Sequence, residues 1–108
     1  MTVPMSLLVA HFLGDFILQS DWMASNKSKR WDALALHVAL YAVCFLWWGW
    51  LFAVITFALH FAQDAVTSRI NSRLYAAGQR HWFFVGIGAD QLLHFALLAW
   101  TLQIIERY

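Results

Sequence analysis

Long apolar stretches separated by two polar segments organise this chain. The apolar stretches cover approximately residues 3–18, 33–62 and 82–105. As one helix, the middle stretch would be about 45 Å long, well beyond the ~30 Å hydrocarbon core of a bilayer. Gly49 lies halfway along it, in the segment Trp47-Trp48-Gly49-Trp50, and clustered tryptophans are typical of the bilayer interface. We therefore predict a turn at Gly49 with a helix on either side of it.

This pattern predicts an all-α fold, a polytopic membrane protein whose single domain, residues 1–108, is a four-helix transmembrane bundle. The four spans are expected at about residues 3–19, 33–48, 50–67 and 82–105. In the third loop, residues 69–77 place Ile70 and Leu74 on one side of a helix and Arg69 and Arg73 elsewhere. That arrangement predicts a short interfacial helix in the headgroup layer, with a solvated loop as the alternative.

The composition agrees with a lipid environment. Hydrophobic residues make up 62% of the chain and charged residues only 12%, whereas soluble domains carry about a quarter charged residues. The net charge is +1, and no basic run is interleaved with aromatics, so we expect no nucleic-acid partner. The N-terminus lacks the basic segment of a secretory signal, so the first helix is expected to be retained.

The placement of the basic residues predicts the orientation. The first polar segment contains Lys27, Lys29 and Arg30, the second contains Arg69, Arg73 and Arg80, and the turn at Gly49 contains none. Basic loops of membrane proteins lie on the cytoplasmic side. Both polar segments are therefore expected in the cytoplasm, and both termini on the non-cytoplasmic side.

Three pairs of histidine and aspartate lie inside the predicted spans, four residues apart. They are His11/Asp15, His60/Asp64 and Asp90/His94. Residues at i and i+4 share one face of a helix, so each pair can direct two polar groups at one spot. A single aspartate at the bilayer centre costs roughly 2.5–3.5 kcal/mol on insertion scales. A bound cation would offset this cost, and neutralisation within buried ion pairs without a metal is the alternative.

Counting from the polar segments places Asp15, His37, Asp64 and Asp90 about 6–14 Å from the cytoplasmic interface. Four helices thus offer polar groups at nearly one depth. The candidate metal ligands are His11, Asp15, His37, His60, Asp64, Asp90 and His94. Imidazole with carboxylate suits a divalent metal, Zn²⁺ first, with Mn²⁺ or Fe²⁺ as alternatives. Seven groups suggest either two ions or one ion with an added general base.

Two further sets of residues are expected to act on a substrate. Asp15, Asp64 and Asp90 are the candidate catalytic residues, because a carboxylate that does not bind the metal can move a proton. The candidate substrate-binding residues are Gln19, Lys27, Arg69, Arg73 and Gln91. Their amides would orient a substrate oxygen, and their cations would hold an anionic headgroup.

These motifs resemble a known family. His11-x-x-x-Asp15, His60-x-x-x-Asp64 and Asp90-Gln91-x-x-His94 are similar to motifs of a domain-of-unknown-function family of small bacterial and phage integral membrane proteins. That family is distantly similar to bacterial inner-membrane proteins described as membrane-bound metal-dependent hydrolases. The resemblance implies a multi-pass protein of the bacterial inner (plasma) membrane and supports treating the matched positions as a site.

Together these observations lead us to expect a membrane-embedded metal-dependent hydrolase that acts near the cytoplasmic leaflet. Its substrate would be a lipid-borne or amphipathic ester or phosphoester. The alternatives are a component of proton or metal-ion transport, in which intramembrane Asp and His form a relay, and a non-enzymatic membrane subunit whose His/Asp site is structural or binds a cofactor such as haem. Membrane lipids are the expected partners, with a homo-oligomer or docking to a larger membrane complex as further options.

Overall fold

The computed structural model describes residues 4–107, and this part of the chain is helical without a strand. The elements are α1 (Met5–Phe12), η1 (Leu13–Ile17), α2 (Asp21–Asn26), α3 (Trp31–Val43), η2 (Leu46–Trp48), α4 (Trp50–Ala76) and α5 (Arg80–Arg107). The all-α prediction is confirmed. Residue 3, where the first span was predicted to begin, lies outside the described residues.

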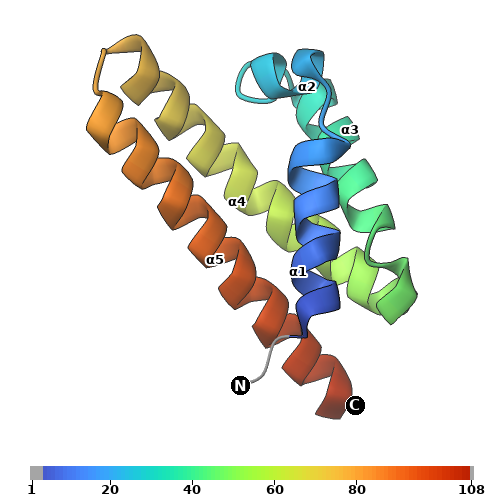
Figure 1. The fold of residues 1–108 in the computed structure, drawn as a ribbon. Helices are drawn as coiled ribbons and strands as arrows, with labels where there is room; N and C mark the ends of the chain where they lie inside the picture. Colours follow the sequence, from blue (N-terminus) through green and yellow to red (C-terminus); the bar gives the residue numbers. More distant parts are fainter. Residues whose placement is uncertain (1–3, 108) are drawn as a thin grey trace.

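Helices α4 and α5 are the long elements of the structure and run side by side in opposite directions (Figure 1). They have 27 and 28 residues, which corresponds to about 40 Å each. Both are long and apolar enough to cross a membrane, whereas the apolar segments Met5–Ile17 and Trp31–Val43 are shorter. Two of the four predicted spans therefore reach membrane-crossing length. The start of α1 and the end of α5 lie at the same end of the molecule, opposite α2 and the α4–α5 turn.

The break predicted in the long apolar stretch is present. Helix α3 ends at Val43, η2 forms one tight turn, and α4 begins at Trp50. Gly49, between η2 and α4, has φ +106°, a conformation that a side chain disfavours and glycine adopts at little cost. Glycine at this position therefore lets the chain reverse between two apolar helices.

The separate interfacial helix predicted in the third loop is wrong. Helix α4 continues unbroken to Ala76, because residues 68–76 contain neither glycine nor proline. The helix ends only where Gly78 adopts φ +73°. This extension also packs against other elements: Ser72 Oγ donates to Ser28 Oγ at 2.8 Å, and the space beside Gly86 of α5 is filled by Asn71.

A hydrophobic core closes the end of the bundle at which α1 begins. It consists of Leu7, Ala10, Tyr41, Phe45, Phe52 and Leu98, from α1, α3, the α3–η2 connection, α4 and α5. Each of the His/Asp motifs follows or precedes one of these core residues within a few turns. The motifs therefore form the next layer of the bundle, between the core and the end that carries the basic segments.

The segment before α3 is held by local caps. Ser20 Oγ accepts from the Met23 backbone N–H at 3.2 Å and caps α2, and the Met23 side chain is buried. Arg30 donates two hydrogen bonds to the Asp32 carboxylate, at 3.0 and 2.7 Å, which lowers the pKa of that carboxyl. These contacts fix the connection that carries Lys27 over the end of the bundle.

Candidate metal centre

A local irregularity positions Asp15. Residues 13–17 form one turn of π-helix, in which Leu18 N–H donates to Leu13 C=O at 2.8 Å. Such turns occur mostly as insertions in helices and are frequent at functional sites. Gly14 lies against α3 here, since a Cβ at this position would be 2.7 Å from Tyr41 Cδ2. The absence of a side chain at Gly14 thus brings η1 close enough for Asp15 to reach α3.

Four side chains from three segments of the chain direct one atom each at a common point. We call Asp15, His37, His60 and Asp64 the central cluster. His37 Nε2 lies 3.1 Å from Asp15 Oδ1 and 3.2 Å from Asp64 Oδ2. His60 Nε2 lies 3.5 and 3.3 Å from the same two oxygens and 3.3 Å from His37 Nε2. Any two of these four atoms lie within 4.8 Å of each other.

These separations match the ligand shell of a small divalent cation. Zinc binds imidazole nitrogen and carboxylate oxygen at about 2.0–2.2 Å in a tetrahedron, so neighbouring ligand atoms are about 3.3–3.6 Å apart. The five separations given above range from 3.1 to 3.5 Å. Two carboxylates and two imidazoles also form an ordinary donor set for Zn²⁺, Mn²⁺ or Fe²⁺. The central cluster is therefore a candidate metal centre by both distance and chemistry.

Several polar atoms leave the cluster short of hydrogen bonds. Asp15 Oδ1, His37 Nδ1 and His60 Nδ1 are buried and have no hydrogen-bond partner among residues 4–107. His37 and His60 are only 1% and 2% exposed. Buried polar atoms without partners are costly. A cation at the centre would pair Asp15 Oδ1, whereas the two Nδ1 atoms, across each ring from Nε2, would stay unpaired.

His94 and Asp90 form a second group next to the central cluster. The ring of His94 stacks on that of His60, with centroids 4.1 Å apart. His94 Nδ1 lies 3.6 Å from Asp90 Oδ2 and 3.8 Å from Asp15 Oδ2. Gln63 Nε2 donates to Asp90 Oδ1 at 2.9 Å and fixes that carboxylate. The structure thus places His94 between Asp90 and the oxygen of Asp15 that does not face His37.

His11 has a different surrounding from the other predicted ligands. Its Nδ1 lies 2.6 Å from Tyr41 Oη, and its Nε2 lies 2.6 Å from Gln91 Oε1. Both ring nitrogens are therefore occupied by hydrogen bonds. His11 holds Gln91, whose Nε2 in turn donates to Asp15 Oδ2 at 3.3 Å. Its position suits the support of ligands better than direct ligation.

Tyr41 is a buried site residue that the sequence did not single out. It hydrogen-bonds His11, and its ring stacks on His60 with centroids 3.8 Å apart. The signal was present, because Tyr41 follows His37 by four residues and so shares its helix face. All seven predicted ligands also lie in this layer, each at most 8% exposed.

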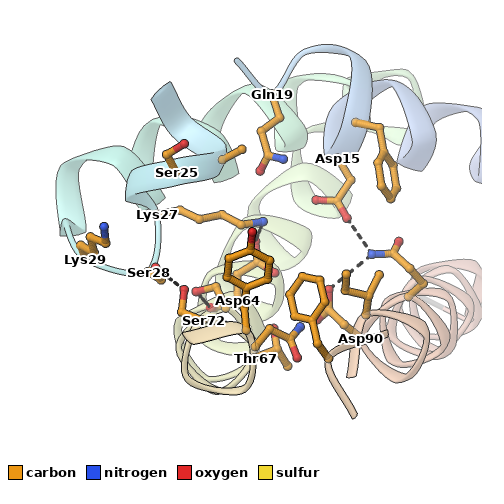
Figure 2. Close-up of a pocket in the computed structure, with 18 of the residues that line it drawn as sticks. Asp15, Gln19, Ser25, Lys27, Ser28, Lys29, Asp64, Thr67, Ser72 and Asp90 are labelled. Carbon is orange, nitrogen blue, oxygen red and sulfur yellow. Dashed lines mark hydrogen bonds and ion pairs between the residues drawn. The ribbon is translucent and has the colours of Figure 1, made fainter. Parts of the chain in front are cut away.

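A cavity of about 610 Å³ opens directly beside this layer (Figure 2). Asp15, Asp64 and Asp90 are among the residues that line it. Its walls come from η1, α2 and the connections on either side of α2, the second half of α4 and the first half of α5. Apart from the three aspartates, the polar lining residues are Gln19, Ser25, Lys27, Ser28, Lys29, Thr67, Ser68, Asn71, Ser72, Tyr75 and Gln91. This volume is typical of pockets that bind small organic molecules.

Lys27 reaches from the α2–α3 connection into the cavity (Figure 2). Its Nζ lies 3.4 Å from Asp64 Oδ2, and its side chain is 18% exposed. Gln19 and Gln91 also line the cavity. Three of the five predicted substrate-binding residues are thus at the cavity.

The other two, Arg69 and Arg73, do not line the cavity. They follow Asp64 by five and nine residues, which turns them about 140° and 180° away from it around α4. Arg69 instead donates to Ala65 C=O at 2.7 Å and lies 4.2 Å over the Trp31 ring. The residues of α4 that line the cavity after Asp64 follow it by three, four, seven, eight, eleven and twelve positions, namely Thr67, Ser68, Asn71, Ser72, Tyr75 and Ala76.

Comparison with curated proteins and with solved structures gave no match. A family model described as "Protein of unknown function (DUF3307)" matches residues 3–107, nearly the whole chain. The match agrees with the resemblance to a domain-of-unknown-function family, and it assigns no activity to the site. The chain therefore belongs to the DUF3307 family of proteins of unknown function.

Proposed function

We propose that this protein is a metal-dependent hydrolase of the membrane, with a divalent cation, Zn²⁺ first, bound by the central cluster. The observation that carries the proposal is the convergence of Asp15 Oδ1, His37 Nε2, His60 Nε2 and Asp64 Oδ2, with separations of 3.1 to 3.5 Å. Without an ion, the two carboxylates would be neutralised only by the two imidazoles and Lys27, and Asp15 Oδ1 would stay buried without a hydrogen bond.

The proposed setting is a four-span bundle in the bacterial inner membrane, with the cavity facing the cytoplasmic leaflet. Two helices of spanning length support it. The basic segments lie at the cavity end, which the positive-inside rule assigns to the cytoplasm. The shorter helices α1–η1 and α3 pack beside the long pair, and local thinning of the bilayer can accommodate short spans.

The proposed reaction is hydrolysis of an amphipathic ester in the cavity, beside the aspartates that line it. A bound divalent cation lowers the pKa of water toward ~7 and polarises the scissile group. Asp90, which faces the cavity and lies outside the central cluster, takes the proton of the attacking water. The water oxygen forms the new bond, and the same carboxyl group returns its proton to the leaving alkoxide as the bond to the ester centre breaks.

The cavity walls favour a phosphoester among the esters. Lys27 and Lys29 line it together with serine and threonine hydroxyls, which are ordinary partners of phosphate oxygens. Apolar side chains, Phe16, Phe83 and Ile87, share the wall, so an amphipathic substrate can keep its acyl part against them. The substrate class is therefore proposed to be a lipid-borne phosphoester.

The transport alternative has less support in this structure. The layer of His and Asp residues is followed by the packed core of Leu7, Tyr41, Phe45, Phe52 and Leu98. A continuous polar path through one chain would have to cross that core. The structural-site alternative is weakened by the cavity, because a site that only holds helices together needs no open space beside its ligands.

The test is a hydrolysis assay on protein reconstituted in lipid nanodiscs. Two chromogenic substrates of equal chain length are compared, an alkyl p-nitrophenyl phosphodiester and a p-nitrophenyl carboxylate ester. We expect zinc-dependent turnover of the phosphodiester that is lost in His60→Ala and kept in His81→Ala, whose histidine is exposed. Equal rates for wild type and His60→Ala with both substrates would contradict the proposal.

A further inference from the structure

The central cluster uses only one oxygen from each of its two aspartates. Asp15 Oδ1 and Asp64 Oδ2 face His37 and His60. The second oxygens, Asp15 Oδ2 and Asp64 Oδ1, lie 3.8 and 3.6 Å from the two ring nitrogens of His94. The lone pairs of the two ring nitrogens point in different directions, so an ion on His94 Nδ1 would share the Asp15 carboxylate, and not that of Asp64, with the central cluster.

The burial of His94 is not explained by hydrogen bonding. The residue is 2% exposed, and within the described part of the chain neither of its ring nitrogens forms a hydrogen bond. All three nearby carboxylate oxygens lie at 3.6 to 3.8 Å, too long for hydrogen bonds. Separations of this size are close to those between two ligands of one metal ion.

Asp90 supplies a further carboxylate on the same side. Its Oδ2 lies 3.6 Å from His94 Nδ1. Gln91 Nε2 lies 3.3 Å from Asp15 Oδ2 and 3.4 Å from Asp90 Oδ2, so the two acidic oxygens converge on a group that carries partial positive charge. A cation bound between these two oxygens would replace the Gln91 amide group as the positive partner of both carboxylates.

On this geometry we propose a second divalent-cation site, formed by His94 Nδ1, Asp90 Oδ2 and Asp15 Oδ2. It rests on the proposed function in that the first ion occupies the central cluster. The Asp15 carboxylate then bridges a pair of ions, which in two-metal hydrolytic sites are about 3.5–4 Å apart.

The charges favour an anionic substrate in such a centre. Asp15, Asp64 and Asp90 carry three negative charges, and Lys27 carries one positive charge within 3.4 Å of Asp64. One divalent ion makes this set neutral, and a second ion adds two positive charges. A hydroxide and a phosphodiester, each with one negative charge, would neutralise them, which links the second ion to the proposed phosphoester substrate.

Metal counting tests the second site independently of activity. Purified protein is loaded with Mn²⁺ or Zn²⁺, and bound metal per chain is measured by elemental analysis after removal of excess ion. We expect about two ions per chain in wild type and about one in Asp90→Asn and His94→Ala. Asp21→Asn, in which an exposed aspartate is changed, is the matched control and should keep both ions.

The electron paramagnetic resonance spectrum of the Mn²⁺-loaded protein provides a second readout. Wild type should show exchange coupling between neighbouring ions, and Asp90→Asn should show the spectrum of isolated Mn²⁺. The remaining ion in Asp90→Asn also shows that the variant is folded. One uncoupled ion in both proteins would overturn the second site while leaving the proposed function intact, and no ion in wild type would overturn both.

Discussion

His37 and His60 face each other with their Nε2 atoms 3.3 Å apart, although one belongs to α3 and the other to α4. Both nitrogens also face Asp15 and Asp64. Only one proton can lie between two such nitrogens. A direct hydrogen bond between them would use that proton and leave the carboxylate oxygens with fewer hydrogen-bond donors. A metal ion accepts a lone pair from both imidazoles at once, so a bound ion accounts for all four groups together.

Removing the metal should destabilise the folded protein. A ligand at 100 times its dissociation constant stabilises the native state by about 2.7 kcal/mol. Treatment with a strong chelator should therefore lower the Tm of the detergent-solubilised protein, and added Zn²⁺ should restore it. Differential scanning fluorimetry measures both. An unchanged Tm of the wild type on chelation would contradict a stabilising ion. A decrease in Tm of the same size in His60→Ala would show that the chelator does not act by removing an ion from the central cluster.

Acidification should release the metal. The ligand form of histidine is neutral, so protons compete with the ion for His37 and His60, and the metal-free protein binds more protons than the metal-bound one. The metal affinity must therefore fall as the pH falls. Equilibrium dialysis of the protein against buffered Zn²⁺ at several pH values measures this dependence. An affinity that rises on acidification would contradict ligation by histidine.

Lys27→Gln should weaken substrate binding. A hydrogen bond to a charged group contributes about 1.5–3 kcal/mol, which corresponds to roughly a 10- to 100-fold increase in KM for an anionic substrate. Arg73→Gln is the matched control, because it removes a positive charge from the same end of the molecule but outside the cavity. Similar KM values for the two variants would show that Lys27 acts only through general charge.

Gly14→Ala should disturb both packing and metal binding. The new Cβ would lie 2.7 Å from Tyr41 Cδ2 and 3.1 Å from Tyr41 Cα, and overpacking of this kind costs about 1–3 kcal/mol. It should push η1 and Asp15 away from α3. Gly88→Ala is the control, since its new Cβ would have no atom of the described residues within 4 Å beyond its own local backbone. Chemical denaturation and metal affinity of the two variants should differ clearly, and equal values would refute the close approach.

Tyr41→Phe should act through His11. It removes the oxygen that lies 2.6 Å from His11 Nδ1 and leaves a buried nitrogen without a partner, a cost of about 1–3 kcal/mol. Tyr75→Phe changes an exposed tyrosine and should leave the stability unchanged. The Tyr41 hydroxyl contacts His11 and not the central cluster. Tyr41→Phe should therefore lower the Tm and leave the number of bound ions per chain unchanged. Equal Tm values for the two variants would contradict this role of Tyr41.

Much of the site followed from residue spacing. The three i, i+4 pairs of His and Asp, and their common distance from the polar segments, place six polar groups in one layer, and the distance of His37 from the first polar segment adds the seventh. The lengths of the helices were less predictable: α3 ends at Val43 rather than at residue 48, and α4 continues to Ala76 rather than ending at residue 67. The π-turn at Asp15 and the early end of α3 depend on packing between helices, and no local signal in residues 13–17 or 43–45 marks them.

The arginines illustrate a different limit. Arg69 and Arg73 were grouped with Lys27 by charge and by proximity in the sequence. Once α4 is known to continue past Ser68, helical phase alone turns them away from Asp64 and brings Thr67, Asn71 and Ser72 to the cavity. Lys27 reaches the cavity because α2, capped by Ser20, places the α2–α3 connection over the end of the bundle. This is a tertiary feature, which the periodicity of the sequence does not reveal.

X-ray absorption spectroscopy of zinc-loaded wild-type protein, with parallel metal analysis of His37→Ala and His81→Ala, tests the central claim most directly. We predict bound zinc with only nitrogen and oxygen neighbours at about 2.0–2.2 Å, a loss of zinc in His37→Ala and full occupancy in His81→Ala. Wild-type protein that binds no zinc, manganese or iron, or His37→Ala protein that binds as much as wild type, would contradict the claim.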